Sequence, residues 1–226
     1  MDARGIEQTL DEAERLLRSG AAIDLRTLGF WRAVTAAKRE PKYRARYADR
    51  IAAIDRDAFR RRVPLRFGAG VGIALMTLGT MVGIVVLWLA AAFQPPTREL
   101  LVLIGMGALL VCTHALAHVV VGSLAGIRFT DWFIDLPRRP QPGMKTDYAT
   151  YLRASPRARA WMHAAGAIVS KIVPFAVIPY ALSISCGTWA IFILAAVGVV
   201  GLVTDALFSV RASDWKKFRR EMRFAR

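Results

Sequence analysis

Four long runs of apolar residues lie in the last two thirds of the chain. They cover about residues 67–93, 100–126, 162–182 and 189–210, with few charged positions inside them. An α-helix needs about 20 residues to cross the hydrocarbon core of a bilayer, and each run has roughly that length or more. None of the runs shows the alternation of apolar and polar positions that is typical of a strand in a membrane barrel. The pattern therefore predicts an all-α polytopic membrane protein with four transmembrane helices.

Short connections join these runs in pairs. Pro95 and Pro96 separate the first two runs, and residues 183–188 separate the last two. Connections this short leave no room for a crossover, so each pair should form an antiparallel helical hairpin. We therefore expect a membrane domain over residues 67–210, preceded by a small segment at 1–66 and followed by a basic tail at 211–226.

Residues 1–66 carry a different, amphipathic pattern. Apolar side chains recur at helical spacing from Ile6 to Leu17, and Ser19-Gly20 is a typical helix end. Further helical stretches are expected over residues 28–39 and 43–62. We interpret this segment as a helical collar that lies on the inner face of the membrane. A dedicated partner-binding domain is the alternative.

The charged residues follow the apolar pattern. The 226 residues include 32 Lys+Arg against 17 Asp+Glu, a net charge of +15, although 55% of the residues are hydrophobic. Thirty of the 32 bases lie in residues 1–66, 126–161 and 211–226. The positive-inside rule then places both termini and the middle loop in the cytoplasm. Because anionic headgroups account for this charge, we expect membrane lipids as partners and no nucleic acid.

A few ionisable residues lie inside the expected spans, where their cost makes each one a functional candidate. They are His114, His118, His163, Lys171 and Asp205. His114 and His118 stand four residues apart, so both imidazoles project from one helix face and can offer two ligands to one metal ion. Asp205 would complete a site with an open position for water, the pattern of catalytic zinc. Packing of the His pair against neighbouring helices is the alternative.

These residues resemble a known family. The run Thr113-His114-Ala115-Leu116-Ala117-His118 is similar to the H-E-x-x-H helix of the site-2 protease family of intramembrane zinc metalloproteases, with Ala in place of Glu. The small residues at 164–167 resemble the family's A-G-P element. Asp205 stands where the family places its third zinc ligand. The resemblance covers about residues 100–210.

The resemblance implies a fold, a cofactor and a substrate class. It implies Zn²⁺ held by His114, His118 and Asp205, with the metal polarising the substrate carbonyl and carrying the attacking water. The implied reaction is hydrolysis of a peptide bond in or near the membrane, with a transmembrane protein or peptide as substrate. The compact membrane domain and the resemblance together imply a prokaryotic inner membrane as the location.

Ala115 decides what such a chain can do. In an H-E-x-x-H site the Glu takes a proton from the attacking water, and a methyl group cannot accept a proton. The Glu is not a ligand, so a metal site can persist without it. Two explanations fit: an engineered inactive form of an enzyme, which we favour, or a natural pseudo-enzyme that binds without cutting. Under either explanation, we expect the chain as written to be nearly inactive.

Two further residues are weaker catalytic candidates. His163 could serve as a further ligand, as a hydrogen-bond donor to the transition state or as an interfacial residue. Lys171 is expected near the middle of the bilayer, where it would neutralise Asp205, stabilise an oxyanion or extend outward to the headgroups.

The middle loop contains a strand-like stretch at residues 127–134, followed by a stretch rich in Pro and Gly at 137–143. In the family that the chain resembles, a strand near the active site can receive substrate as an added strand. We therefore take four residues as candidates for substrate binding: Phe129, Thr130, Asp131 and Trp132. An aromatic segment at the membrane surface is the alternative.

Two other functions fit the same residues. A non-catalytic pseudo-protease scaffold would bind transmembrane partners and would have Ala115 as its natural residue. A metal or proton transporter would use the intramembrane His, Lys and Asp side chains as a relay, although no inverted repeat is visible in the sequence. The sequence carries no feature that indicates the natural substrate or the oligomeric state.

Overall fold

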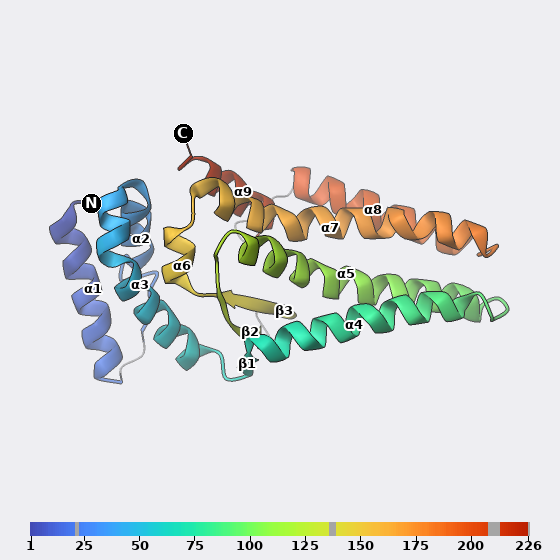
Figure 1. The fold of residues 1–226 in the computed structure, drawn as a ribbon, viewed down its shortest axis with the longest axis horizontal. Helices are drawn as coiled ribbons and strands as arrows, with labels where there is room; N and C mark the ends of the chain where they lie inside the picture. The colour runs from blue at the N-terminus through green and yellow to red at the C-terminus, as the bar shows by residue number, and fades with distance from the viewer. Residues whose placement is uncertain (21–22, 136–138, 208–212, 226) are drawn as a thin grey trace.

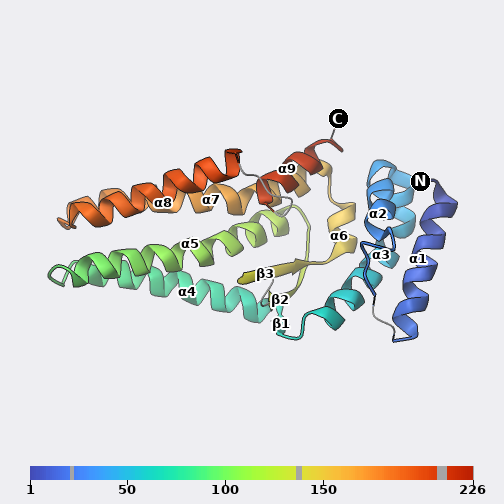
Figure 2. The ribbon, with the colours of Figure 1, turned by 180° about the vertical axis from the view of Figure 1, so that it is seen from behind.

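The computed structural model describes residues 1–20, 23–135, 139–207 and 213–225, with only the backbone described at 139–141 and 205–207. Long helices run side by side along the molecule, and the N-terminal helices lie together at one end of them (Figure 1; Figure 2). The hairpins α4–α5 and α7–α8 form as the short connections predict, and α5 packs against α7. The long helices are α4 (Ala69–Ala90), α5 (Thr97–Leu124), α7 (Pro156–Ser183) and α8 (Thr188–Leu207).

Three of these helices, α4, α5 and α7, are long and apolar enough to cross a membrane. Within the described part of α8, the apolar stretch runs only from Thr188 to Thr204, so the expected fourth span is not confirmed. Leu78, Trp88 and Phe192 project from the long helices and are 61%, 72% and 72% exposed. Large apolar side chains exposed in such numbers are unfavourable in water and natural in lipid, which indicates a membrane protein.

The N-terminal residues fold into three helices that pack on one another: α1 (Ala3–Arg18), α2 (Phe30–Arg39) and α3 (Pro41–Arg62). Ile6 of α1, Phe30 of α2 and Ile51 of α3 are completely buried in a common core. The apolar faces of these helices therefore pack against one another. We call this packed helical unit the N-terminal unit.

A three-stranded antiparallel sheet lies where the long helices meet the N-terminal unit (Figure 1). Its strands, in spatial order, are β1 (Arg66–Gly68), β2 (Phe129–Asp135) and β3 (Arg139–Thr146). The strand expected near residues 127–134 is β2, the central strand. β1 and β3 were not expected. β3 includes part of the Pro- and Gly-rich stretch, whose composition is unfavourable for a strand. Pairing with β2 supplies backbone hydrogen bonds that outweigh this local composition, and an edge strand tolerates Pro.

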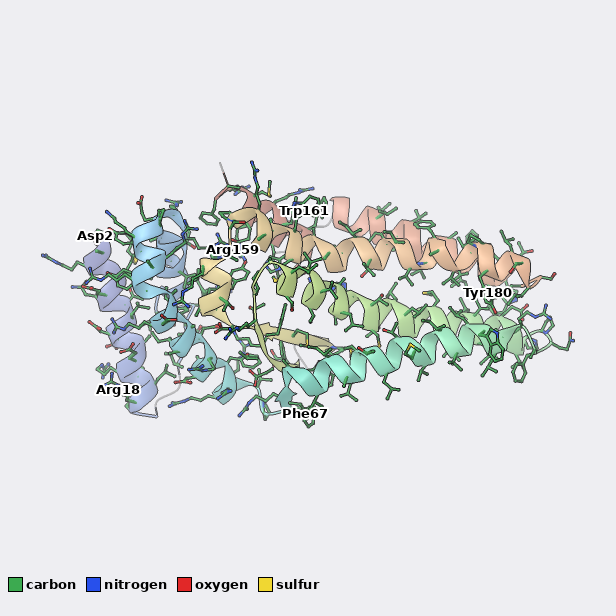
Figure 3. All side chains as sticks on the ribbon, in the orientation of Figure 1. Asp2, Arg18, Phe67, Arg159, Trp161 and Tyr180 are labelled. Carbon is green, nitrogen blue, oxygen red and sulfur yellow. The ribbon has the colours of Figure 1, made fainter. Side chains whose placement is uncertain are left out.

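Two short helices complete the described fold: α6 (Tyr148–Arg153) and α9 (Asp214–Met222). Helix α9 packs against α7 and carries Glu221, which is fully buried. Glu221 accepts hydrogen bonds from Nε of Arg159 on α7 at 2.8 Å and from Nζ of Lys38 on α2 at 2.6 Å. Arg159 lies at the junction between the long helices and the N-terminal unit (Figure 3). One carboxylate therefore connects α9 to both parts of the molecule.

Candidate metal centre

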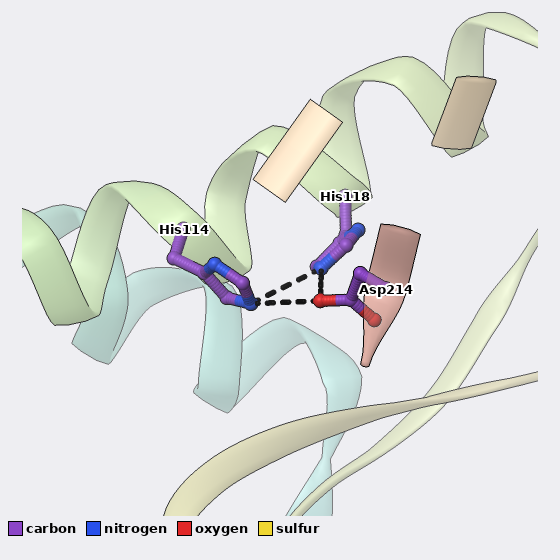
Figure 4. Close-up of side chains that lie close together, drawn as sticks. All are labelled: His114, His118 and Asp214. Carbon is purple, nitrogen blue, oxygen red and sulfur yellow. Dashed lines mark hydrogen bonds and ion pairs between the residues drawn. The ribbon is translucent and has the colours of Figure 1, made fainter. Parts of the chain in front are cut away.

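His114 and His118 lie one turn apart on α5 and point to the same side, as their spacing predicts. Their Nε2 atoms are 3.2 Å apart. Both rings point toward Asp214, the first residue of α9 (Figure 4). The Asp214 Oδ2 atom lies 3.3 Å from Nε2 of His114 and 3.2 Å from Nε2 of His118. Two helices that are far apart in the sequence thus bring three potential metal ligands together.

The start of α9 fixes the position of Asp214. Ser213 caps this helix, with its side chain accepting a hydrogen bond from the Lys216 backbone N–H at 3.3 Å. The Asp214 Oδ1 atom accepts a hydrogen bond from Nζ of Lys217 at 2.8 Å, which leaves Oδ2 directed at the His pair. Burial raises the pKa of Asp214, but hydrogen bonds from His114 and His118, in the state in which the rings carry Nε2–H, and the charge of Lys217 outweigh burial and lower the pKa well below its usual range. The carboxylate is therefore an anion at neutral pH.

Hydrogen bonds on the far side of each ring determine where the imidazole protons lie. His118 Nδ1 is 2.6 Å from the carbonyl oxygen of Met162, which can only accept, so Nδ1–H is the donor. His114 Nδ1 is 2.7 Å from Oγ of Ser170. The single hydroxyl proton of Ser170 is donated to the Gly166 carbonyl at 2.9 Å, so Ser170 accepts from His114. In the neutral form of both rings, the Nε2 lone pairs are free and face Asp214.

This arrangement brings three acceptors together without a donor between them. Two imidazole lone pairs and one carboxylate oxygen repel one another unless a cation lies among them, and that cation is either a metal ion or protons on the rings. Two ligand atoms of a tetrahedral zinc ion, each bound at 2.0–2.1 Å, are about 3.3–3.4 Å apart. The observed separations of 3.2, 3.2 and 3.3 Å are close to this value. The donor set therefore fits zinc.

The small residues at 164–167 lie where α7 passes close to His118. A Cβ atom on Gly166 would come within 2.3 Å of Nε2 of His118, a distance that no real contact permits. Glycine at this position therefore allows α7 to approach the ligand. The same approach brings the Met162 carbonyl and the Ser170 hydroxyl within hydrogen-bond reach of the two rings.

Ala115 follows His114 directly on α5. Its methyl group is buried in an apolar cluster with Met76, Cys112 and Trp132, against which Met144 of β3 also packs. The indole Nε1–H of Trp132 is buried in this cluster and has no hydrogen-bond partner among the described residues.

The two weaker catalytic candidates lie elsewhere. Nε2 of His163 is 3.0 Å from the hydroxyl of Tyr151 on α6, and His163 is not part of the group of possible ligands found among the described residues. The Lys171 side chain extends toward α8, where a Cβ on Gly201 would lie 3.8 Å from its Cε atom. Neither placement adds a ligand to the centre.

The third ligand expected from the sequence was Asp205, whose side chain lies outside the described residues. Among the described residues, the structure places Asp214 at the His pair. The sequence pattern predicts only a basic tail over residues 211–226, because ionisable residues are unusual inside the apolar runs and common outside them. One signal was available: Asp214 and Glu221 are the two acids in that tail. Ser213 before Asp214 is also a typical helix cap.

The four candidates for substrate binding lie on β2, and their setting differs from the expected one. At residues 131–133, β2 is paired with β1 on one side and with β3 on the other. Asp131 and Trp132 are also buried. An added strand cannot pair with this part of β2, because both of its edges are taken. β3 is an edge strand of the sheet and packs against α5 and α4.

Comparisons with protein-family models, with curated proteins and with solved structures found no match, so the function of this centre has to be argued from its chemistry.

Proposed function

We propose that this protein is a zinc-binding membrane protein of the intramembrane metalloprotease type, in a form that lacks the general base. The observation that supports the metal is the convergence of Nε2 of His114, Nε2 of His118 and Oδ2 of Asp214, with both Nδ1–H groups already donated elsewhere. Two His and one carboxylate leave a ligand position open, which is the catalytic rather than the structural pattern.

The residues around the centre have separable roles in this proposal. Bound zinc would supply Lewis acidity toward a carbonyl and toward water. Met162 and Ser170 hold the imidazoles in the tautomer that presents Nε2, and Lys217 holds the carboxylate. Ala115 cannot accept a proton, so the chain as it stands would bind a peptide without cutting it. A peptide would be held extended along the outer edge of β3, as an added strand.

A non-catalytic scaffold is the second candidate, and one observation favours it. Ala115 is well buried among apolar side chains, so alanine suits this position structurally. The unpartnered Nε1–H of Trp132 in the same cluster favours the opposite interpretation, that a polar residue belongs at position 115. Replacement of Ala115 by Glu separates the two candidates, because only an inactivated protease should gain activity from it.

The metal content of the purified protein tests the proposal. The chain is extracted in detergent without chelators, and its metal is measured by elemental analysis alongside three variants: His114→Ala, Asp214→Asn and Asp205→Asn. We expect about one zinc per chain in the parent and in Asp205→Asn, and none in the other two. Loss of zinc in Asp205→Asn but not in Asp214→Asn would make Asp205 the ligand. A parent chain without metal would remove the basis of the proposal.

A further inference from the structure

A cavity of about 1030 Å³ opens between the N-terminal unit and the long helices, and Lys217 is one of the residues that line it. Its walls come from α2, α6, α9 and the start of α7. A volume of this size is at the upper end of the range of small-molecule sites. The proposed metal centre does not use this cavity, although the two share Lys217.

The charge of the cavity is of one sign. Among the described residues that line it there is no carboxylate, and its cations are Arg26, Lys38, Arg39, Lys217, Arg220 and Arg223. Lys38, Lys217 and Arg220 lie near Glu221 or Asp214. The other three arginines form no ion pair with any described residue. A low-dielectric wall lined by one sign of charge concentrates the opposite charge.

Arg159, whose guanidinium lies over the ring of Tyr151 in the cavity wall, adds a further buried cation. Lys38 and Arg159 share the single carboxylate of Glu221, so two buried cations are balanced by one anion. Nη2 of Arg159 is buried and has no hydrogen-bond partner among the described residues. A buried charge is normally paired with an opposite charge. An anion bound nearby would therefore stabilise the one buried cation that has no carboxylate of its own.

Aromatic side chains form the rest of the wall: Trp31, Tyr148, Tyr151 and Phe224. Trp31 is 39% exposed, so its ring is available to a ligand. Guanidinium groups bind phosphate oxygens in pairs, while aromatic faces take up the apolar or planar part of a ligand. A carboxylate ligand would use fewer of these donors.

From the unpaired arginines, the excess buried cation and the aromatic wall, we propose that this cavity binds a phosphate-bearing anion. The phosphate belongs either to the headgroup of a phospholipid or to a soluble phosphorylated compound, and the chemistry of recognition is the same. Bound there, the anion would also attract Lys217, which holds Asp214 by its Oδ1 atom. Binding of the anion would therefore affect the metal centre through the Lys217 side chain.

Two binding arms distinguish the sources. In the first, the full chain in phosphatidylcholine nanodiscs is titrated with inorganic pyrophosphate and with ATP, and binding is measured by calorimetry. In the second, native mass spectrometry counts the phosphatidylglycerol and phosphatidylcholine molecules that the detergent-extracted chain retains. The pocket variant is Arg39→Gln with Arg223→Gln. The matched control is Arg4→Gln with Arg60→Gln, which removes the same charge from two exposed arginines outside the cavity.

We expect at least one arm to show binding that the pocket variant weakens by about tenfold or more and that the control leaves within about twofold. Binding in the first arm alone assigns a soluble ligand, and binding in the second alone assigns a lipid. Equal weakening in both variants would show that only the general charge of the chain attracts anions, and would overturn the proposal. So would the absence of binding in both arms. Arg26→Gln, a third exposed pocket arginine, repeats the test if the double variant unfolds.

Discussion

His118 donates its Nδ1–H to the carbonyl oxygen of Met162 across 2.6 Å, and this contact between α5 and α7 determines which ring nitrogen faces Asp214. A backbone carbonyl cannot donate, so the ring has one neutral tautomer available to it in this position. The hydroxyl of Ser170 fixes the tautomer of His114 in the same way. It donates its own proton to the Gly166 carbonyl and therefore accepts the hydrogen bond from His114 Nδ1–H. Outer contacts of this kind orient metal-binding imidazoles and tune their affinity.

Ser170→Ala should weaken zinc binding without abolishing it. The variant removes the acceptor for the His114 Nδ1–H, and the loss of such an outer contact typically costs about 10- to 100-fold in metal affinity. The affinity is measured by competition with a chromophoric chelator. Ser183→Ala is the matched control, because this exposed serine near the end of the same helix bonds only to the Tyr180 carbonyl. Unchanged affinity in Ser170→Ala would show that the hydroxyl does not orient the ligand.

Gly166→Ala should disrupt the centre more severely. The added methyl would lie 2.3 Å from Nε2 of His118, so the ring or the helix has to move. We expect loss of stoichiometric zinc and a lower unfolding temperature. Gly107→Ala on α5 is the control, since a Cβ there has nothing within 4 Å. If Gly166→Ala kept full zinc content, α7 would have to pass the ligands at a greater distance than described.

Glu221→Gln should loosen α9 and with it the metal centre. The substitution leaves Lys38 and Arg159 buried without a carboxylate, and removal of one member of a buried ion pair costs about 3–5 kcal/mol. The free energy of unfolding and the zinc content should both fall, because Asp214 lies on the same helix. Glu12→Gln, on the surface of α1, should change neither. A Glu221→Gln chain that loses stability but keeps its zinc would show that α9 is held in place by other contacts.

Lys38 should make stability depend on pH in the alkaline range. Burial lowers the pKa of Lys38 to about 8, although Glu221 opposes the shift. In the unfolded chain a lysine titrates near 10.4. Between these two values the unfolded chain binds more protons, so the free energy of unfolding should rise from about pH 8 to 10.4. Below pH 8 this contribution is constant. To isolate this contribution, the free energy of unfolding is measured at several pH values for the parent and for Lys38→Met. If the two plots of free energy against pH were parallel, the lowered pKa of Lys38 would be contradicted.

Ala115→Glu should produce peptide-bond hydrolysis if the chain is an inactivated protease. The new carboxylate would supply the missing proton acceptor, with the Trp132 indole N–H as a donor within the same cluster. Activity is measured on transmembrane peptides in detergent or liposomes, after zinc content has been checked. Ala115→Gln is the control of equal size that cannot act as a base. A zinc-loaded Ala115→Glu chain that cuts none of the peptides would favour the scaffold.

The sequence by itself determined the positions of the long helices and two of the three side chains in the candidate metal centre. Local periodicity sets where the helices lie, and the i, i+4 spacing of His114 and His118 puts both rings on one face whatever surrounds them. These features depend only on residues within a turn or two of the same helix, so they can be predicted without knowledge of the tertiary structure.

Only the tertiary structure decided which carboxylate meets the His pair and how the remaining segments pack. Asp214 reaches the centre because Glu221, two turns along the same helix, is buried against Arg159 and Lys38, and these partners are distant in the sequence. The strands β1 and β3 exist because β2 pairs with both. Contacts of this kind join residues dozens of positions apart, so their energies leave no periodic trace in the chain.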